Sequence, residues 1–327
     1  MKRLFSFVLT LLLIGLVILV GAATYGWVWY SSYSDRTDMV VVAIPPGTGV
    51  HALTDLLVEA EVIDQPLLFK AAIVLSGSQS KLKAGEYEFP AQASPQTVLQ
   101  KLIKGSTITH ALTFPEGLTT AQMLTLVAQD PRLTGEIPEK VGEGRLMPDT
   151  YHFHRGDSRA AVVARMQKAM DEALAQAWES RTQDLPISTP EEALILASVV
   201  ERETGVDDER PRVAAVFVNR LRLGMPLQSD PTVVYGIELA HGPMNRSLTR
   251  NDLKRDHAHN TYTRGGLPQG PIANPGKASI QATLNPPKTN ELYFVATGTG
   301  GHHFATTLAE HNRNVARYRA IMRQQAQ

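Results

Sequence analysis

The stretch "LASVVERETG", residues 196–205, sets two carboxylates two residues apart at the end of an apolar run. A carboxyl group that is partly withdrawn from water has a raised pKa, because burial disfavours its charged form. Such a group can be protonated near neutral pH and act as a general acid. The plain alternative is that Glu201 and Glu203 only solvate a helix end, so the surrounding elements must decide between the two interpretations.

The glutamate pair closes a segment with strong helix signals, residues 188–205. Thr189 is the predicted N-cap, Pro190 occupies the first helical position, and Glu192 completes a T-x-x-E capping box. Gly205 is the predicted terminator. The sequence therefore predicts one well-defined helix that carries both carboxylates near its C-terminal end.

A helix turns by about 100° per residue, so the two glutamates face different sides of it. One face is predicted to carry Leu194, Ala197, Ser198 and Glu201, and the roughly opposite side Leu196, Val199 and Glu203. Ala197 and Ser198 are small and precede Glu201 by one turn. We therefore expect a shallow groove beside Glu201 that seats a ligand against a partly desolvated acid.

Three further elements are predicted around this helix. They are a helix over residues 208–224 that ends at Gly224, a helix over 274–287 that opens on Asn274 and Pro275, and a hairpin over 291–305. Helices dominate the second half of the chain, and the predicted fold class is α+β.

The first half contains shorter elements. Strands are predicted at 40–44 and at "GEYEFP", with helices from residue 50, over 66–77 and over 94–105, the last from Ser94 as N-cap to Gly105. Residues 41–60 and 111–130 align as two related strand–turn–helix units, without a period regular enough for a solenoid. Their predicted role is either recognition of an extended polymer or scaffolding.

The N-terminus predicts a membrane anchor. Lys2 and Arg3 are followed by no charge until Asp35, and a transmembrane helix needs about 20 apolar residues. Trp27, Trp29 and Tyr30 cluster at the far end, where aromatic rings favour the membrane–water boundary. A cleaved signal peptide is the alternative, but its apolar core usually has only about 7–15 residues. The positive start predicts a cytoplasmic N-terminus, a single pass through the cytoplasmic (inner) membrane and a periplasmic remainder.

Composition excludes several classes of function. The 327 residues include 32 basic and 32 acidic side chains, so no net positive charge is available to hold nucleic acid. Cysteine is absent, which excludes disulfides, thiolate metal sites and cysteine nucleophiles. The length suits two modest domains or one large one.

Several blocks in a fixed order carry a family resemblance. They are "GRLMPDTYHF" (144–153), "LASVVERETG", "VFVNRLRLGMPLQSDPTVVYG" (216–236), "HNTYTRGGLPQGPIANPG" (259–276) and "LYFVATGTGGHHFATTLAEHN" (292–312). Together they resemble the signature blocks of the MltG (YceG-like) endolytic murein transglycosylases, apart from Arg145 and Met147. The resemblance implies a cytoplasmic tip and transmembrane helix over 1–34, a LysM-like region over 35–108, and a helix-rich YceG-like catalytic domain over 109–327.

The resemblance implies that the protein cleaves peptidoglycan within its glycan strands. The bond cut joins N-acetylmuramic acid to N-acetylglucosamine, and the product carries a 1,6-anhydromuramoyl end. The family's catalytic glutamate is matched to Glu201. One carboxyl group suffices, because the attacking oxygen is the sugar's own C6 hydroxyl, whereas ordinary glycosidases need two carboxylates. No metal or cofactor is expected.

The resemblance also matches polar positions that we expect to bind sugar hydroxyl and acetamido groups, namely Gln228, Asp230, Asn260 and Tyr262. Glu203 is a candidate for keeping the surroundings of Glu201 polar or for binding substrate, and His302 matches a family histidine.

Structural alternatives stay open for several of these residues. Asp230 precedes Pro231 and is also a typical helix N-cap. His302 also fits a hydrogen-bonded structural role. Arg220 and Arg222 either meet stem-peptide carboxylates or lie on a solvated helix face.

Three rival functions remain at this stage. A zinc hydrolase would use "HAH" (257–259) and "HH" (302–303), but no H-E-x-x-H is present and adjacent strand residues point to opposite faces. A non-catalytic, membrane-tethered peptidoglycan-binding protein is the second, and a hydrolase that yields reducing ends is the third. Tethering to the membrane predicts contact with nascent glycan strands, and proximity to the peptidoglycan synthases is a further hypothesis.

Overall fold

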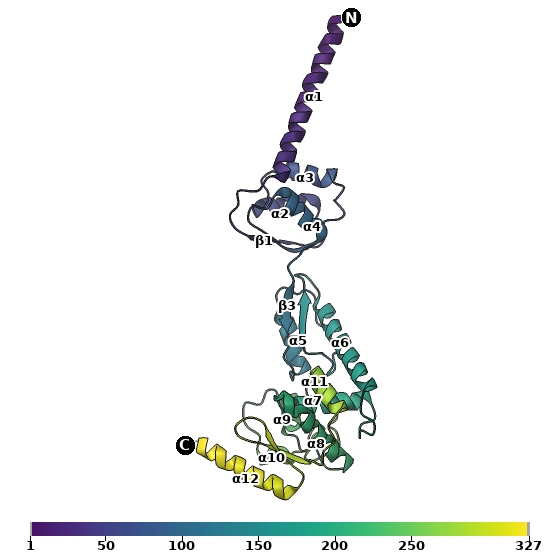
Figure 1. Cartoon of the computed structure of the whole chain (residues 1–327), viewed down its shortest axis with the longest axis vertical. Coiled ribbons are helices and arrows are strands. Elements are labelled where there is room, and N and C mark those ends of the chain that lie inside the picture. Colours follow the sequence, from purple (N-terminus) through teal and green to yellow (C-terminus); the bar gives the residue numbers. More distant parts are fainter. Residues whose placement is uncertain (1, 326–327) are drawn as a thin grey trace. The chain divides into compact units, whose positions relative to one another are not determined.

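The computed structural model describes residues 2–325. The chain forms two compact units, which Figure 1 follows by colour along the sequence. Residues 1–110 and 152–157 belong to the first unit, and 111–151 and 158–327 to the second. The short return of 152–157 to the first unit was not expected from the sequence. The domain limits given above stay predictions.

Helix α1, Lys2–Ser31, is long and apolar. Over Arg3–Ser31 its most apolar window has a mean hydropathy of 2.9, and none of that window is buried. Such a helix is long enough to cross a membrane. A single apolar N-terminal helix is therefore confirmed, whereas its orientation stays a prediction.

The rest of the first unit packs three helices against a two-stranded sheet. Strands β1 (Val40–Ile44) and β2 (Gly85–Phe89) pair antiparallel, and the helices are α2 (Val50–Glu59), α3 (Pro66–Leu75) and α4 (Pro95–Lys104). The core contains Leu53, Leu57, Phe69, Ile73, Tyr87, Phe89, Val98 and Leu102. The predicted limits of α4 are confirmed, because Ser94 Oγ accepts from Thr97 N–H and Gly105 is left-handed with φ +73°. The LysM-like character of this region stays a prediction.

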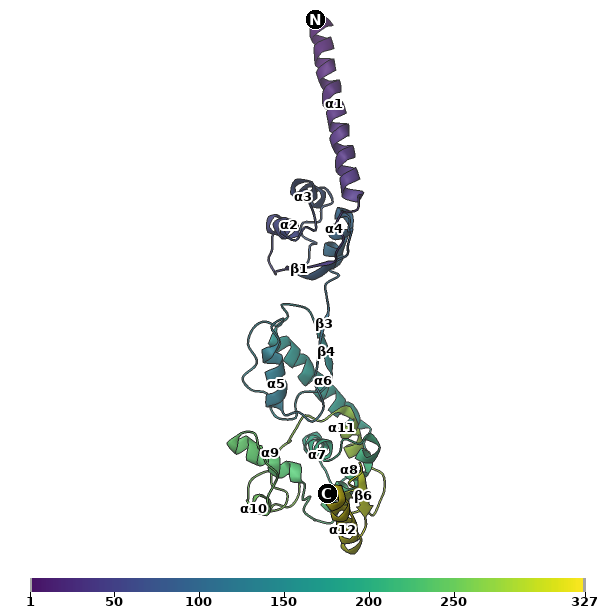
Figure 2. The same cartoon turned by 90° about the vertical axis from the view of Figure 1, so that its left-hand side faces the viewer.

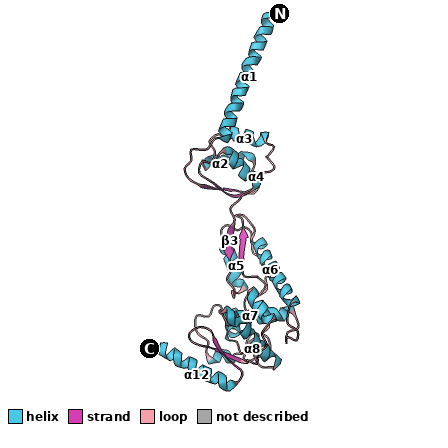
Figure 3. Ribbon diagram, viewed as in Figure 1, coloured by secondary structure: helices cyan, strands magenta, loops and turns pink. Residues whose placement is uncertain are grey.

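The second unit is dominated by helices, as the cyan ribbons in Figure 3 show. They are α5 (Thr120–Gln129), α6 (Arg159–Glu179), α7 (Pro190–Glu203), α8 (Arg210–Arg222), α9 (Asp230–His241), α10 (Arg250–Lys254), α11 (Lys277–Leu284) and α12 (Leu308–Gln325). Two short strands, β3 (His110–Thr113) and β4 (Thr150–Phe153), pair with each other, and β5 (Tyr293–Ala296) forms an antiparallel hairpin with β6 (His302–Ala305). The α+β class and the C-terminal hairpin are confirmed.

Helix α7 lies at the centre of the second unit. It contacts α6, α8, α9 and α11, and its position between these neighbours is visible in Figure 2. All eight residues from Ala193 to Val200 are buried. Because the helix is apolar all round along this stretch, it is held as a core helix, and only its two ends reach polar surroundings.

The ends of α7 differ from the prediction. Thr189 Oγ1 accepts from Glu192 N–H at 3.1 Å, as expected for an N-cap, but the Glu192 carboxylate accepts from Ser188 N–H instead of closing the capping box on Thr189. The helix ends at Glu203, and Thr204 follows in extended backbone with φ −141°. Gly205 is therefore not a left-handed terminator, and that prediction was wrong.

Helix α11 starts later than predicted. It begins at Lys277 with Gly276 as N-cap, whereas the sequence favoured Asn274 and Pro275. The reason is tertiary: the buried Asn274 side chain accepts from Leu146 N–H at 2.8 Å and donates to Leu118 O at 3.0 Å. These contacts fix Asn274 outside the helix.

Candidate active site

The two glutamates at the end of α7 enter different surroundings, as a separation of two helical positions requires. Glu203 faces the start of α9, where Ser229 Oγ donates to Glu203 Oε1 at 2.5 Å. Glu201 faces the loop before α11, where Gly276 N–H donates to Glu201 Oε2 at 2.9 Å. The candidate site therefore depends on which of these surroundings contains a cavity.

Glu203 lines a cavity of about 450 Å³. The remaining lining residues come from α8, the loop before α9, the first residue of α9, the loop around residue 262, the β5 strand and α12. They are Arg220, Leu227, Gln228, Asp230, Tyr262, Phe294, Val295, His311 and Val315. Three predicted binding residues, Gln228, Asp230 and Tyr262, are thus brought together around Glu203. Glu201 is not among the residues that line this cavity.

Burial raises the pKa of the Glu203 carboxyl to about 7. The hydrogen bond from Ser229 and the positive charge of Arg220 act in the opposite direction, and the negative charge of Asp230 adds to the rise. Desolvation is the largest of these effects. A carboxyl group with this pKa exchanges its proton readily near neutral pH, which is what a general acid that later acts as a base requires.

Arg220 on α8 holds the wall of the cavity in place. Its guanidinium is buried and donates from Nε to Leu292 O and from Nη1 to Leu227 O, each at 2.7 Å. The solvated helix face considered for Arg220 is therefore wrong, whereas Arg222 is exposed and donates to Asp184 O at 3.1 Å. Arg220 links β5 to the loop that carries Gln228.

Gln228 adopts a backbone conformation that residues other than glycine rarely take. Its φ is +54°, and its N–H donates to Thr261 O at 3.2 Å. A non-glycine residue in this region costs free energy, and such positions cluster at functional sites. The tertiary contacts on both sides of Gln228 hold this exposed amide at the rim of the cavity.

Asp230 and Tyr262 form a hydrogen-bonded pair in the cavity wall. The Tyr262 hydroxyl donates to Asp230 Oδ1 at 2.6 Å, and burial together with the Asp230 carboxylate raises the pKa of Tyr262. Ser229 occupies the N-cap position of α9, and Asp230 is its first helical residue. The alternative that Asp230 is an ordinary N-cap is therefore wrong, and its carboxylate instead accepts the hydrogen bond from Tyr262.

The opposite wall comes from residues that the sequence did not single out. Phe294 and Val295 on β5 and His311 and Val315 on α12 line it. The His311 ring stacks on Tyr293 with centroids 5.2 Å apart, and burial lowers the pKa of His311, with a further contribution from the Arg220 charge. One indication of this wall was present in the sequence, because Phe294, Val295 and His311 lie within the family block over 292–312, whereas Val315 lies outside it.

Two predicted binding residues support the cavity without lining it. Asn260 is fully buried: its Nδ2 donates to Leu253 O and Arg255 O, and its Oδ1 accepts from Tyr262 N–H at 2.8 Å. Its side chain thus shapes the turn that presents Tyr262. The expectation that Asn260 contacts substrate directly is not supported by this arrangement.

His302 is likewise a supporting residue. Its Nδ1 lies 2.7 Å from Glu209 Oε2, and its N–H donates to Glu209 Oε1 at 2.8 Å. Burial raises the pKa of Glu209, but these hydrogen bonds outweigh burial and lower it overall. The ring packs edge-on against Phe294 at 5.3 Å. The structural alternative for His302 is therefore the one that the geometry favours.

Glu201 belongs to a polar cluster in which the side chains of Glu201 and Arg210 are buried, whereas those of Glu116 and Asp207 are exposed. The Glu201 side chain is only 6% exposed, and its Oε1 lies 4.0 Å from Nη2 of Arg210. Arg210 also approaches Glu116 at 3.7 Å and Asp207 at 2.8 Å. Burial, and next the nearby Glu201 carboxylate, raise the pKa of Glu116. The cluster ties the end of α7 to the start of α11 and to the loop at Glu116.

The groove predicted beside Glu201 is filled by protein. Ala197 and Ser198 are fully buried, and Ser198 Oγ accepts from Ile272 N–H at 3.0 Å while donating to Ile195 O at 2.7 Å. The small side chains let the segment before α11 approach α7 closely. The prediction of a ligand groove on this face was wrong.

The histidine pairs do not gather with other ligands. Within residues 2–325, no group of three or more histidine, aspartate or glutamate side chains is placed to hold a metal ion. His259 instead packs edge-on against Tyr235 at 4.9 Å.

Residues 42–317 match the sequence profile of the YceG-like family. The chain belongs to the YceG-like family. The match covers the first unit from residue 42 onward and every residue that lines the cavity, from Glu203 to Val315. The family resemblance inferred from the signature blocks is thereby confirmed.

Relatives named endolytic murein transglycosylase are similar over most of the chain. An endolytic murein transglycosylase of Bacillus subtilis (strain 168) is 30% identical over 315 residues, which are 87% of this chain and 86% of the relative. An endolytic murein transglycosylase of Streptococcus pneumoniae serotype 2 is 30% identical over 328 residues, or 85% of this chain and 58% of the longer relative.

A solved structure of the YceG-like family shares the architecture. The crystal structure of a putative YceG-like protein from Listeria monocytogenes superposes with a TM-score of 0.52 at 31% identity. The similarity covers 84% of this chain and 99% of that structure.

Proposed function

We propose that this YceG-like protein is an endolytic lytic transglycosylase of peptidoglycan in which Glu203 is the catalytic acid and base. The observation that carries the proposal is the Glu203 carboxyl group, with a pKa raised to about 7, at the wall of an open polar cavity. The names of the relatives support this activity. Glu203 replaces Glu201 in the role that the sequence had assigned.

The reaction needs one group that gives and then takes a proton. Protonated Glu203 donates its proton to the glycosidic oxygen, and the bond between this oxygen and C1 of N-acetylmuramic acid breaks. The resulting carboxylate accepts the proton of the C6 hydroxyl as O6 bonds to C1. The products are a free N-acetylglucosamine hydroxyl and a 1,6-anhydromuramoyl end, and Glu203 regains its proton. No second carboxylate is required to activate water.

The geometry favours Glu203 over Glu201 for physical reasons. A proton-transfer group must reach its substrate, and Glu203 lines a cavity while Glu201 packs against Gly276 and Arg210. Ser229 fixes one oxygen of Glu203 by its hydrogen bond, which orients the carboxyl group. Glu201 is instead held as an ion-paired, hydrogen-bonded structural residue.

The other cavity residues fit a sugar ligand. The Gln228 amide and the Asp230–Tyr262 pair offer both donors and acceptors to hydroxyl and acetamido groups, and Phe294 and Val295 give an apolar surface for the sugar ring. These residues position the glycan in our proposal. Asn260 holds Tyr262 by a hydrogen bond to its N–H, and His302 packs against Phe294. No metal or cofactor takes part in the proposed reaction.

We further propose that α1 anchors the enzyme in the cytoplasmic membrane with the remaining chain on the outer, periplasmic side. The apolar length of α1 and the position of Lys2 and Arg3 at its N-terminal end support this orientation. An anchored enzyme meets glycan strands as they are polymerised at the membrane. It therefore cuts nascent strands and limits their length, close to the peptidoglycan synthases.

Digestion of purified glycan strands by the wild type, Glu203→Gln and Glu201→Gln tests the assignment. We expect anhydro ends from the wild type and Glu201→Gln, and their loss in Glu203→Gln with glycan binding retained. Mass spectrometry separates anhydro from reducing ends, which differ by one water. Reducing ends from the wild type would indicate a hydrolase, and unchanged cleavage by Glu203→Gln would overturn the assignment. Binding without cleavage by the wild type would indicate a non-catalytic peptidoglycan-binding protein.

A further inference from the structure

The exposed face of α3 is entirely apolar. Its outward side chains are Leu67, Ala71, Val74 and Leu75, which recur at the spacing of one helical face. Leu67 is 79% exposed and Leu75 is 87% exposed. The opposite face packs Phe69 and Ile73 into the core of the first unit, so α3 is apolar on both sides. Core packing therefore does not account for the outer stripe.

The single charge of α3 points away from this stripe. Lys70 is directed at α2, where its Nζ contacts His51 Nδ1 and lies 3.9 Å from Asp55 Oδ1. No other residue from Pro66 to Leu75 is charged. The outer face is consequently free of any group that would have to be desolvated on entering an apolar phase.

The stripe continues directly onto the membrane helix. Helices α1 and α3 contact each other, and a groove of about 480 Å³ runs between them. The groove is lined by Ala22, Ala23, Gly26, Trp27, Trp29, Tyr30, Leu68, Ala71, Ala72, Leu75 and Ser76, none of which is charged. The apolar surface of α1 and that of α3 thus form one continuous surface.

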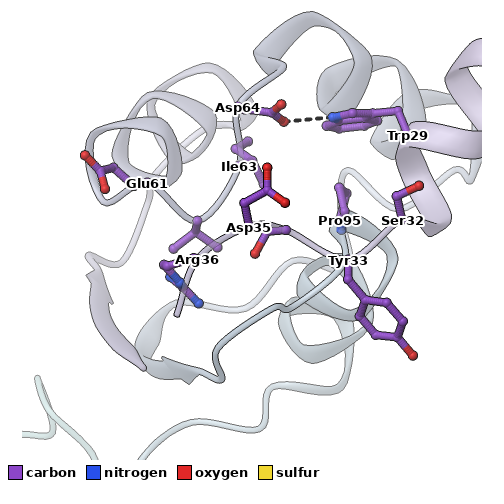
Figure 4. Close-up of a pocket in the computed structure, with 11 residues that line it drawn as sticks. Trp29, Ser32, Tyr33, Asp35, Arg36, Glu61, Ile63, Asp64 and Pro95 are labelled. Carbon is purple, nitrogen blue, oxygen red and sulfur yellow. Dashed lines mark hydrogen bonds between the residues drawn. The ribbon is translucent and has the colours of Figure 1, made fainter. Parts of the chain in front are cut away.

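A hydrogen bond fixes α3 at the depth of the interfacial aromatic residues. Trp29 Nε1 donates to Asp64 Oδ1 at 2.8 Å, two residues before α3 begins, and Figure 4 shows this bond. Tryptophan side chains favour the membrane–water boundary. Asp35, Arg36 and Glu61 line the same pocket as Trp29 and Asp64, so this pocket contains charged groups while the stripe carries none.

We infer that α3 is a second membrane contact, an interfacial helix whose Leu67–Ala71–Val74–Leu75 stripe lies in the outer leaflet beside α1. The inference rests on the proposed anchoring by α1. A helix that lies in the interface buries its exposed apolar face at the boundary of headgroups and acyl chains, while the other apolar face of α3 packs on the core of the first unit. The contact seats the first unit on the lipid surface and restricts its rotation about the anchor.

The absence of cysteine from the chain permits a direct test. The single variants Leu67→Cys and Leu75→Cys are made in the full chain and labelled with an environment-sensitive fluorophore. Each labelled protein is reconstituted in phosphatidylcholine–phosphatidylglycerol vesicles at a low protein-to-vesicle ratio, so that most vesicles that contain protein contain one copy. Leu12→Cys within α1 is the control for anchoring. Leu223→Cys, 63% exposed in the second unit, is the matched control for an exposed leucine.

We expect blue-shifted emission from the labels at 67 and 75, quenching by shallow doxyl-labelled lipid, and protection from aqueous iodide. The label at 223 is expected to behave in the opposite way. Quenching by lipid at 12 together with open access of iodide at 67 and 75 would overturn the inference and leave the anchor intact. Loss of lipid quenching at 12 would overturn the anchor itself. Protection of the labels at 67 and 75 from iodide without quenching by doxyl-labelled lipid would indicate that the stripe contacts protein, and would also overturn the inference.

Discussion

The hydroxyl of Ser229 donates a hydrogen bond of 2.5 Å to Oε1 of Glu203. The two residues are 26 positions apart in the sequence, and the bond joins the end of α7 to the start of α9. Ser229 is almost fully buried, so water cannot easily replace its hydroxyl. The bond stabilises the ionised form of Glu203 and opposes the effect of burial on its pKa.

Replacing Ser229 by alanine is expected to raise the pKa of Glu203 further. Because Glu203 must be protonated to donate, the alkaline limb of the pH profile of kcat/KM should move to higher pH, by about one unit. The measurement is kcat/KM on purified glycan strands between neutral and alkaline pH. Ser180→Ala, at an exposed hydroxyl at the end of α6, is the control. An alkaline limb that stays in place in Ser229→Ala would contradict the assigned role.

The raised pKa of Glu203 also predicts how stability depends on pH. Between the ordinary value of 4.5 and about 7, the folded protein keeps a proton that the unfolded chain releases. The free energy of unfolding should therefore fall as pH rises through this window, by roughly 3 kcal/mol at most. Glu203→Gln cannot ionise, so we expect its stability relative to the wild type to be greater at pH 8 than at pH 5.

Thermal or denaturant unfolding of the two proteins at both pH values measures this difference. Glu179→Gln, which removes an exposed carboxylate at the end of α6, controls for the change in net charge. Equal stability differences at pH 5 and pH 8 would show that Glu203 is not desolvated in the folded protein.

Tyr262→Phe removes the donor to Asp230 and leaves that carboxylate unpaired in the cavity wall. We expect a loss of kcat/KM of about tenfold or more, with unfolding free energy reduced by only about 0.5–1.5 kcal/mol. Steady-state kinetics and thermal unfolding separate the two effects. Tyr235→Phe is the matched control, because its hydroxyl also donates to a carboxylate, Glu143 Oε2 at 3.2 Å, away from the cavity. Equal kinetic losses in both variants would argue against a specific role for Tyr262.

Glu201→Ala is expected to destabilise the fold while sparing catalysis. It leaves Gly276 N–H without its acceptor and removes one carboxylate from the surroundings of Arg210, at a cost of about 1–3 kcal/mol. Thermal unfolding measures the loss, and activity is compared per folded molecule at a temperature where both proteins are folded. Glu201→Gln retains an acceptor and should lose less stability. A folded Glu201→Ala protein without activity would return the catalytic role to Glu201.

Local signals in the sequence predicted most of the elements that surround the site. Thr189 and Pro190 specify the start of α7 through short-range capping, and Ser94 and Gly105 specify both ends of α4 in the same way. Predictions failed where a side chain expected to cap its own helix forms hydrogen bonds with residues far away in the sequence. Asn274 has the side chain of a good N-cap, but its amide is used by Leu118 and Leu146, more than a hundred residues away in the sequence.

The sequence by itself determined the apolar N-terminal helix, the helix that carries both glutamates, and the family, because these depend on composition, local capping and ordered blocks of residues. It determined the angle between Glu201 and Glu203 on α7 as well, since helical geometry fixes that angle. Only the tertiary structure placed Glu203 in the wall of a cavity and Glu201 against Gly276 and Arg210. These two positions depend on contacts between residues far apart in the sequence. Ser229 and Tyr262 surround Glu203, and the segment at Gly276 packs against Glu201. Such contacts set the desolvation that lets a carboxyl group act as an acid near neutral pH.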